Sequence, residues 1–343
     1  MLTVAVAAAA IAIALALHLR KIIQGYYWDR SFTPSRDLHG CVAVVTGANS
    51  GLGKATSQEL ASYGVKVIMA CRSTRRGEEA MRYIKARVIG ADLEVWQLDV
   101  SSISSIDSFT TALTKQFPKL DFLVNNAGVG WLPSEAPLTC KDTGVCTLFQ
   151  TNFVGPARLT LSLLPLLKAA ASSGGHARVV SVSSGAHTRA TVGRCLEDIN
   201  EHSDALLGGK YGQSKLAQIM WTKELQRRVN TERGAVQGGG DLRCVAVTPG
   251  FVRTPAFFSA LQGLHLLPRI AAFLLTPFIF IISRSMHTGA QVIVMGCAGE
   301  VKGGAYYSNC LEKPSSGKHN ISNDPLRCAE LWKLTEELLE KGM

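Results

Sequence analysis

The sequence predicts an α/β protein with a single doubly wound parallel sheet, preceded by an N-terminal transmembrane anchor helix. Three observations predict this organisation. Short apolar runs that fit buried strands alternate with helical patterns along the chain. A glycine-rich turn at 47–53 joins the first strand to the first helix, and an apolar run without Asp, Glu, Lys or Arg occupies 2–19. Strands and helices alternating at this spacing imply right-handed crossovers between parallel strands.

The beginning of the chain is expected to lie outside this sheet. The run at 2–19 is just long enough to span a membrane, and Arg20 and Lys21 follow it directly. A cleaved signal peptide carries its basic residues before the apolar run, so an uncleaved anchor is favoured over secretion as a soluble protein. Basic residues on the C-terminal flank place that side in the cytosol. The expected divisions are an anchor at 1–21, a juxtamembrane linker at 22–37 and one folded domain at 38–343.

The composition limits the kinds of partner and ligand that we expect for this protein. The formal net charge is +10, but Lys and Arg are dispersed, with no basic helix and no basic stretch interleaved with aromatic residues. This distribution argues against nucleic acid and favours attraction to an anionic membrane surface. The nine cysteines are an odd number without a C-x-x-C pair or metal-ligand spacing. We therefore expect reduced thiols and no metal site.

The predicted elements follow one another regularly. A strand runs from residue 42 into the glycine-rich turn, and further strands are expected at 65–70, 93–98, 122–124, 178–184, 244–248 and 304–307. Helices are expected at 53–63, 78–87, 106–117, from 211 through 225, at 287–297 and at 326–339. A further long helix is expected to contain 151–153 and to end at 167. The chain between 185 and 210 is polar and irregular. Ligands on a parallel sheet of this kind bind beyond the carboxyl ends of its strands.

The glycine-rich turn predicts a cradle for a dinucleotide. Its glycines suit a sharp turn, close approach of the backbone to a cofactor, and close packing of the helix on the strand. The turn also aims the first free N–H groups of the helix, and the positive end of its dipole, at one point that suits a pyrophosphate. Glycines alone also fit an ordinary strand-to-helix loop. The predicted cofactor-binding residues here are Gly47, Asn49, Ser50, Gly51, Leu52 and Gly53.

The end of the second strand indicates which dinucleotide is bound. In a dinucleotide fold an acidic residue at this point binds the adenine ribose hydroxyls, whereas an arginine accommodates a 2′-phosphate. Here the acid is absent, and Arg72 offers a planar bidentate fork, with Arg75 and Arg76 nearby. We predict NADP(H) rather than NAD; the alternative is that Arg72 is a solvated charge.

A tyrosine and a lysine open the helix predicted from residue 211. Tyr211 and Lys215 are four residues apart, so they point the same way on a helix. The ordinary tyrosine pKa of about 10 is too high for efficient acid/base work near neutrality. A neighbouring ammonium favours the phenolate, so we expect Lys215 to lower the pKa of Tyr211.

A strongly apolar stretch occupies 256–282, and a segment that faces the substrate or the membrane is expected over 256–286. Pro268, Arg269 and Pro277 argue against a second clean membrane span. The stretch fits either buried core or a lid that contacts lipid and admits an apolar substrate. These two interpretations are compatible.

Five motifs, in this order, resemble those of the short-chain dehydrogenase/reductases. They are Thr46-Gly47-Ala48-Asn49-Ser50-Gly51-Leu52-Gly53, Asn125-Asn126-Ala127-Gly128, Ser183-Ser184, Tyr211-x-x-x-Lys215 and Pro249-Gly250. The resemblance covers nearly everything from residue 38 onward and implies a Rossmann-type fold. The chain is more closely similar to the membrane-anchored retinol dehydrogenase branch through Ala70-Cys71-Arg72, 196–200, 251–254 and 304–310.

The resemblance implies a role for each matching residue. Ser184 would hydrogen-bond the substrate oxygen, Tyr211 would act as general acid/base, and Asn152 would belong to a proton relay. Lys215 would also hydrogen-bond the nicotinamide ribose. The remaining implied cofactor contacts are Asp99 and Val100 at the adenine, Asn126, Ala127 and Gly128 at the adjoining ribose, and Pro249, Gly250 and Thr254 at the nicotinamide.

These observations together predict an NADP(H)-dependent oxidoreductase that interconverts an alcohol and a carbonyl on an apolar substrate. Retinal/retinol is the best single candidate, and another lipid aldehyde, a steroid or a polyprenoid ketone is the alternative. Residues 152–156 lack the histidines usual in the retinol branch, which leaves retinoid specificity open. An alternative of another class is a catalytically silent NADP-binding scaffold.

The expected location is an intracellular membrane, crossed once, with the catalytic domain in the cytosol. The endoplasmic reticulum is favoured, with the lipid droplet or a mitochondrial membrane as alternatives. Expected contacts with lipid are the N-terminal anchor and, if it acts as a lid, the stretch at 256–282. The family resemblance also allows a homodimer.

Overall fold

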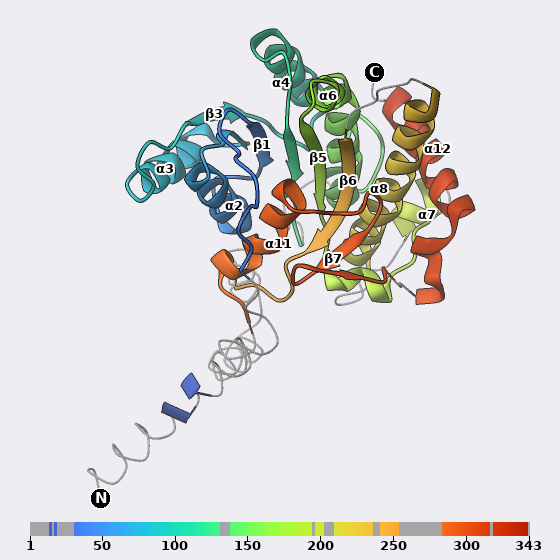
Figure 1. Ribbon diagram of the computed structural model, residues 1–343. Coiled ribbons are helices and arrows are strands. Elements are labelled where there is room, and N and C mark those ends of the chain that lie inside the picture. Colours follow the sequence, from blue (N-terminus) through green and yellow to red (C-terminus); the bar gives the residue numbers. More distant parts are fainter. Residues whose placement is uncertain are drawn as a thin grey trace, which may run out of the picture.

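The computed structural model describes residues 14, 15, 17, 18, 31–130, 138–193, 196–201, 209–235, 241–253, 283–315 and 318–341. The predicted anchor at 1–21 lies outside these residues apart from four positions, and most of the apolar segment at 256–286 lies outside them too. Thr254 is also outside. The described residues form one α/β unit, which confirms the predicted fold class (Figure 1).

One eight-stranded sheet organises the domain. Its strand order is β3-β2-β1-β4-β5-β6-β7-β8, and every neighbouring pair is parallel except β7 and β8. The strands are β1 Val42–Thr46, β2 Lys66–Cys71, β3 Leu93–Gln97, β4 Phe122–Asn125, β5 His176–Val182, β6 Asp241–Thr248, β7 Tyr306–Ser308 and β8 Leu311–Lys313. The order reverses between β1 and β4, and ligands of doubly wound sheets bind at such a point.

Helices connect the strands. They are α2 Gly51–Ser62, α3 Thr74–Lys85, α4 Ile103–Gln116, α5 Thr147–Phe149, α6 Gly155–Ser172, α7 Leu196–Glu201, α8 Lys210–Ala235, α11 Met286–Ala298 and α12 Pro325–Lys341. A π-helical turn, η2 (Gln150–Val154), links α5 to α6, and the 3₁₀ turns are η3 Gly185–Arg189 and η4 Lys318–Asn323.

The helices cover both faces of the sheet with two apolar cores. One core joins the sheet to α2, α3 and α11, and the other joins it to α4, α6, α8 and α12. Successive residues of β1 show the division, because Val44 belongs to the second core and Val45 to the first. Both valines are fully buried. Figure 1 shows α12 lying outside α8, on the side of the sheet away from α3.

Three local features differ from the predicted elements. Strand β8 was not predicted, and it pairs with β7 through a two-residue turn at Asn309 and Cys310. Both turn residues have positive φ, 54° and 57°, which a two-residue hairpin of this kind requires. The long helix up to residue 167 is interrupted by η2, and the irregular stretch at 185–210 contains η3 and α7.

The segment before β1 contacts the domain rather than extending freely from it. The amide of Phe32 donates to Gln291 Oε1 at 2.8 Å, and the hydroxyl of Tyr63 donates to the Phe32 carbonyl at 3.4 Å. Arg36 donates to the carbonyl of Cys297 at 3.5 Å. Part of the predicted linker therefore packs on α2 and α11.

Among the described residues, one helical stretch is long and apolar enough to cross a membrane. It is Thr147–Ser172, which spans α5, η2 and α6, and most of it is buried inside the protein. Its residues Leu159, Leu163 and Leu167 are fully buried in the core against the sheet. We assign it to the core, and it lends no support to the anchor predicted at 1–21.

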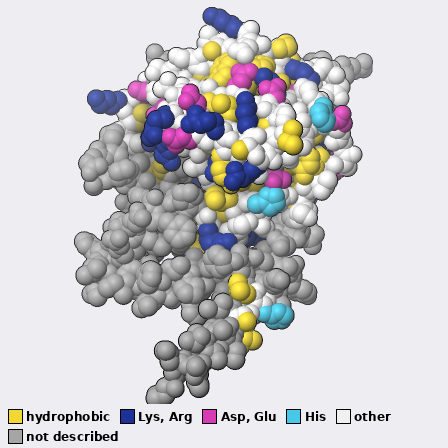
Figure 2. Space-filling model, turned by 90° about the vertical axis from the view of Figure 1, so that its left-hand side faces the viewer, with side chains coloured by type: hydrophobic (Ala, Val, Ile, Leu, Met, Phe, Trp, Pro, Cys, Tyr) yellow, Lys and Arg dark blue, Asp and Glu magenta, His cyan; other side chains and the backbone are white. Residues whose placement is uncertain are grey.

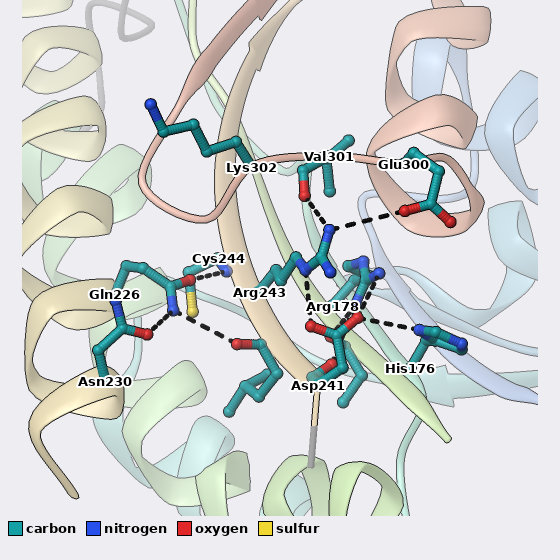
Figure 3. A network of polar contacts seen from close by, with 12 residues as sticks. His176, Arg178, Gln226, Asn230, Asp241, Arg243, Cys244, Glu300, Val301 and Lys302 are labelled. Carbon is teal, nitrogen blue, oxygen red and sulfur yellow. Dashed lines mark hydrogen bonds and ion pairs between the residues drawn. The ribbon is translucent and has the colours of Figure 1, made fainter. Parts of the chain in front are cut away.

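An ion-pair network closes the amino ends of β5 and β6 (Figure 3). The guanidinium of Arg178, only 1% exposed, donates to Asp241 at 3.0 Å. Asp241 also pairs with Arg243 at 2.6 Å and with His176 at 2.9 Å. Burial raises the pKa of Asp241, but its hydrogen bond from His176 and the charges of both arginines outweigh burial and hold it at about 2.

Candidate active site

The predicted site residues lie at the opposite edge, where the strands end. The glycine-rich turn follows β1, Arg72 follows β2, Asp99 lies just beyond β3, and Asn126 follows β4. Ser184 lies just beyond β5, and Pro249 follows β6. A parallel sheet brings these chain segments to one edge, as the sequence predicted.

The glycine-rich turn has the shape of a nucleotide cradle. Gly47 has φ of +67° and Gly51 of +55°, which glycine adopts at no steric cost. A Cβ on Gly53 would lie 2.4 Å from the carbonyl oxygen of Gly47, so no other residue fits there. Ser50 precedes α2 in an extended conformation without a side-chain capping bond, and the first turn contains no acidic residue. These features fit a pyrophosphate at the start of α2.

Thr46 organises the Asn-Asn-Ala-Gly turn after β4. Its Oγ1 accepts hydrogen bonds from the amides of Asn126 at 3.0 Å and Ala127 at 2.9 Å, and donates to the Val124 carbonyl at 3.2 Å. Asn126 Nδ2 donates to the Thr46 carbonyl at 2.8 Å. The side chain of Asn126 thus fixes the β1 and β4 loops to each other, and a ribose contact for it stays a prediction. The sequence signal for Thr46 was its place directly before Gly47.

Gly128 ends this turn and lies close to two of the predicted catalytic residues. A Cβ on Gly128 would lie 3.1 Å from Asn152 Oδ1 and 3.4 Å from Lys215 Nζ. The backbone therefore passes close to both side chains, and a larger residue here would push against them.

The residues at the adenine end differ in exposure. Asp99 Oδ1 accepts from the amide of Ser101 at 2.9 Å and from its hydroxyl at 2.6 Å. Val100 is 6% exposed, and its carbonyl lies where a Cβ on Gly155 would be, at 1.8 Å. Their contacts shape the loop after β3, and contacts with adenine stay a prediction.

Arg72 is exposed directly after β2. Among the described residues it forms no hydrogen bond or ion pair, whereas Arg75 pairs with Glu79 at 2.9 Å. Figure 2 shows the face of the molecule on the α3 side, where Lys and Arg side chains lie beside Asp and Glu. Arg72 therefore keeps its guanidinium available for a phosphate within a surface of mixed charge.

Tyr211 and Ser184 meet through their side chains. Tyr211 lies in the first turn of α8, and Ser184 begins η3 in an extended conformation. Burial raises the pKa of Tyr211, and a hydrogen bond with Ser184 lowers it in part. The predicted lowering of this pKa by Lys215 is therefore wrong in net direction, because burial of the phenol outweighs the favourable contact. A raised pKa keeps the phenol protonated at neutral pH.

Lys215 lies beneath the tyrosine and is 4% exposed. Its Nζ lies 5.7 Å from the centroid of the Tyr211 ring and donates to the Val182 carbonyl at 2.8 Å and to Gln218 Oε1 at 3.2 Å. Burial lowers the pKa of Lys215 to about 8. The ammonium thus has only neutral oxygen partners, which makes it responsive to a negative charge forming nearby.

Asn152 lies in the π-helical turn η2 and is fully buried. Its Oδ1 accepts from the amide of Val129 at 2.8 Å, and its Nδ2 donates to the Val129 carbonyl at 2.9 Å and to Ser214 Oγ at 3.1 Å. Its backbone carbonyl accepts from Gln218 Nε2 at 2.7 Å. Gln218 therefore links Asn152 to Lys215. Gln218 was not among the predicted site residues, although its place three residues after Lys215 on one helix was a signal.

A buried histidine supports the turn that carries Ser184. His187 is 2% exposed, its Nδ1 lies 2.6 Å from the Ser184 carbonyl, and its ring packs edge-on against Tyr306 at 5.0 Å. Burial lowers the pKa of His187. A neutral ring that donates from Nδ1 fixes the main chain at Ser184.

The turn after β6 is held by an arginine that the sequence analysis did not identify. Gly250 has φ of +77°, and Arg284 Nη1 donates to the Pro249 carbonyl at 3.3 Å. A parallel bridge joins Val252 to Arg284. These contacts shape the turn proposed to meet the nicotinamide, while Thr254 lies outside the described residues.

This fold and this site define the class of doubly wound oxidoreductases that use a nicotinamide cofactor. A family model described as short chain dehydrogenase matches residues 41–196. Mouse retinol dehydrogenase 14 is 33% identical over 316 residues, which cover 88% of this chain and 86% of that protein. Bovine dehydrogenase/reductase SDR family member 13 is also 33% identical over 316 residues, covering 89% and 74% of the two chains.

Solved structures with a similar fold support the same family. A protein of uncharacterized function from Mycobacterium paratuberculosis superposes with a TM-score of 0.65 at 30% identity, over 91% of this chain and 98% of that one. L-Sorbose reductase from Gluconobacter frateurii, complexed with NADPH and L-sorbose, has a TM-score of 0.62 at 20% identity, over 80% and 97%, and so shares the fold. The chain belongs to the short-chain dehydrogenase/reductase family and is similar to retinol dehydrogenases.

Proposed function

We propose that this protein is an NADP(H)-dependent oxidoreductase that interconverts an alcohol and a carbonyl on an apolar substrate, with retinal/retinol the favoured pair. The observation that carries the proposal is the hydrogen bond between Ser184 and Tyr211, with Lys215 Nζ 5.7 Å from the centroid of the Tyr211 ring. The similarity to retinol dehydrogenases 12, 13 and 14 supports the substrate class.

The chemistry divides between hydride and proton. A bound reduced nicotinamide supplies the hydride for the carbonyl carbon. The hydroxyl of Ser184 stabilises the negative charge that forms on the substrate oxygen, and the phenol of Tyr211 donates its proton to it. The ammonium of Lys215 then stabilises the phenolate. Asn152 contacts Val129 and Ser214, and we propose that it belongs to the proton relay that returns a proton to Tyr211.

The burial of Tyr211 suits reduction. Since its pKa is raised, the phenol stays protonated at neutral pH and is ready to act as an acid. Oxidation of the alcohol needs the phenolate, so its rate should increase toward alkaline pH until Lys215 loses its charge. We therefore propose carbonyl reduction as the main direction.

Arg72 supports NADP(H) over NAD(H), because its guanidinium lies at the end of β2 without an ion-pair partner among the described residues. The apolar run at 2–19 supports attachment to an intracellular membrane, with the endoplasmic reticulum favoured over the lipid droplet and mitochondria. N-terminal sequencing of the mature protein tests this attachment, and a start after residue 21 would contradict it. A homodimer and lipid contacts of 256–282 belong to the same proposal.

Tyr211→Phe tests the proposed function. Removing the phenolic hydroxyl should lower turnover of all-trans-retinal with NADPH by about 100- to 10,000-fold, the usual contribution of a general acid. Tyr83→Phe is the matched control, because Tyr83 is 41% exposed and lies between Lys54 and Arg87, away from Ser184.

Turnover that survives Tyr211→Phe would remove the proposed acid. Tight NADPH binding by the wild-type protein without turnover of retinal, lipid aldehydes, steroid ketones or polyprenoid ketones would instead favour a silent scaffold.

A further inference from the structure

A cavity lies between α8 and the hairpin of β7 and β8. Its volume is about 230 Å³, far more than the roughly 10–15 Å³ that one water needs. Its polar lining comes from α8, from the loop before β7, from β8 and from η4. None of the four proposed catalytic residues lines it. The charged residues that line it are Lys223, Lys302, Glu312 and Lys313.

Lys223 is the most enclosed of these charges. Its Nζ donates to Ser315 Oγ at 2.6 Å and contacts Asn323 Oδ1, and both of these partners are neutral. No carboxylate among the described residues forms an ion pair with Lys223. Burial lowers the pKa of this lysine. An ammonium in such surroundings is stabilised by an anion that brings both charge and acceptor oxygens.

The other lysines lie at the opening of the cavity. Lys302 and Lys313 are exposed, and Figure 3 shows the Lys302 side chain extending away from the Asp241 and Arg243 network. The nearby Glu300 forms an ion pair with Arg243, with 3.8 Å between Glu300 Oε2 and Arg243 Nη1, and so belongs to that network rather than to the cavity. Three lysines against one glutamate leave the cavity with an excess of positive charge.

We propose that this cavity binds a compact oxyanion, a phosphate or a small carboxylate. Lys223 binds it from the inner wall, and Lys302 and Lys313 bind it from the opening. Ser315 and Asn323 position the Lys223 ammonium for the contact.

The cavity is separate from the proposed active site but lies close to it. Tyr306 forms part of the cavity wall, and the centroid of its ring lies 5.0 Å from that of His187. His187 in turn contacts the Ser184 carbonyl at 2.6 Å. Two side chains, Tyr306 and His187, therefore separate the ligand from Ser184, and its binding is measurable while a dinucleotide fills the cradle.

Calorimetric titration of the full-length protein in detergent with inorganic phosphate, and separately with succinate, tests the proposal. All titrations are made with NADP⁺ at saturation, which fills the glycine-rich turn and the Arg72 contact, because both of these would bind phosphate too. We expect saturable binding at one site, weakened about tenfold or more by Lys223→Met, because a charge-assisted hydrogen bond is lost. Lys302→Ser combined with Lys313→Ser should weaken it several-fold, and Lys115→Ser, an exposed lysine on α4, should leave it unchanged.

The two ligands distinguish the sources, since tighter phosphate binding indicates a phosphate and tighter succinate binding a carboxylate. Absence of saturable binding of both would overturn the proposal, as would equal affinity in all variants. Lys302 and Lys313 are exposed, so their double variant decides the matter even if Lys223→Met does not fold.

Discussion

The two ends of β5 and β6 carry polar clusters of opposite character. At the amino ends, the buried charge of Arg178 is matched by Asp241, which also pairs with Arg243 and His176. At the carboxyl ends, the buried ammonium of Lys215 meets only neutral oxygens.

The pKa values follow this difference. Opposite charges hold the pKa of Asp241 at about 2 despite burial, so the carboxylate stays ionised at neutral pH. Burial without an anion lowers the pKa of Lys215 to about 8, within reach of physiological pH. The first cluster is balanced and stabilises the fold, whereas the second keeps electrostatic capacity for a charge that forms during a reaction.

Lys215→Met should have the largest effect on activity. Carbonyl reduction should fall by about 100- to 10,000-fold, because the phenolate of Tyr211 loses its stabilising charge. The free energy of unfolding should stay equal or rise, since a buried ammonium with neutral partners is replaced by an apolar side chain. Turnover and urea unfolding of the same preparation check both parts, and Lys115→Met is the control. A destabilised Lys215→Met variant with near-normal turnover would mean that Lys215 serves stability rather than activity.

Asp241→Asn should lower the stability of the fold and leave turnover unchanged. It leaves Arg178 buried without its counter-charge, which costs about 3–5 kcal/mol of unfolding free energy. Turnover per folded molecule should not change, because the amino edge lies at the far end of both strands. Asp107→Asn is the control: its pair with Arg158 is 43% exposed on the aspartate side and should matter by about 1 kcal/mol or less. A specific loss of turnover in Asp241→Asn would end the division of roles between the two edges.

Arg72→Ala should have a smaller effect, confined to one cofactor. Loss of a bidentate guanidinium contact should weaken NADPH about tenfold and NADH very little. Arg75→Ala should change neither affinity, because Arg75 pairs with Glu79 on α3. Fluorescence titration with both cofactors checks this. Equal losses for NADPH and NADH would defeat the assignment of NADP(H).

Much of the fold was predictable because its signals are local. Apolar runs mark β1, β2, β4 and β5, and the glycine-rich turn marks the start of α2. The edge strand β8 was missed because its three residues carry no apolar pattern, and its turn uses Asn309 and Cys310 rather than Asn-Gly or Asp-Gly. A single π-helical turn such as η2 likewise leaves no mark in apolar periodicity.

The site was predictable in its members but less so in its electrostatics. Ser184 and Tyr211 meet, as the family motifs implied, because Ser184 lies just beyond β5 and Tyr211 lies in the first turn of α8. Thr46 was named only as part of the glycine-rich motif, and Gln218 and Arg284 were not named at all, because the partners of these three side chains are distant in sequence or are backbone atoms. The direction of the Tyr211 pKa was also wrong, since burial depends on packing that a spacing of four residues does not reveal.

The rate of carbonyl reduction as a function of pH tests the central claim most directly. Tyr211 stays protonated at high pH because its pKa is raised, whereas Lys215 loses its charge as pH passes about 8. The rate should therefore be level near neutrality and decline above pH 8, and Lys215→Arg should move any decline to higher pH because a guanidinium keeps its charge. A rate independent of pH up to about 10, the ordinary tyrosine pKa, would contradict a proton transfer supported by Lys215.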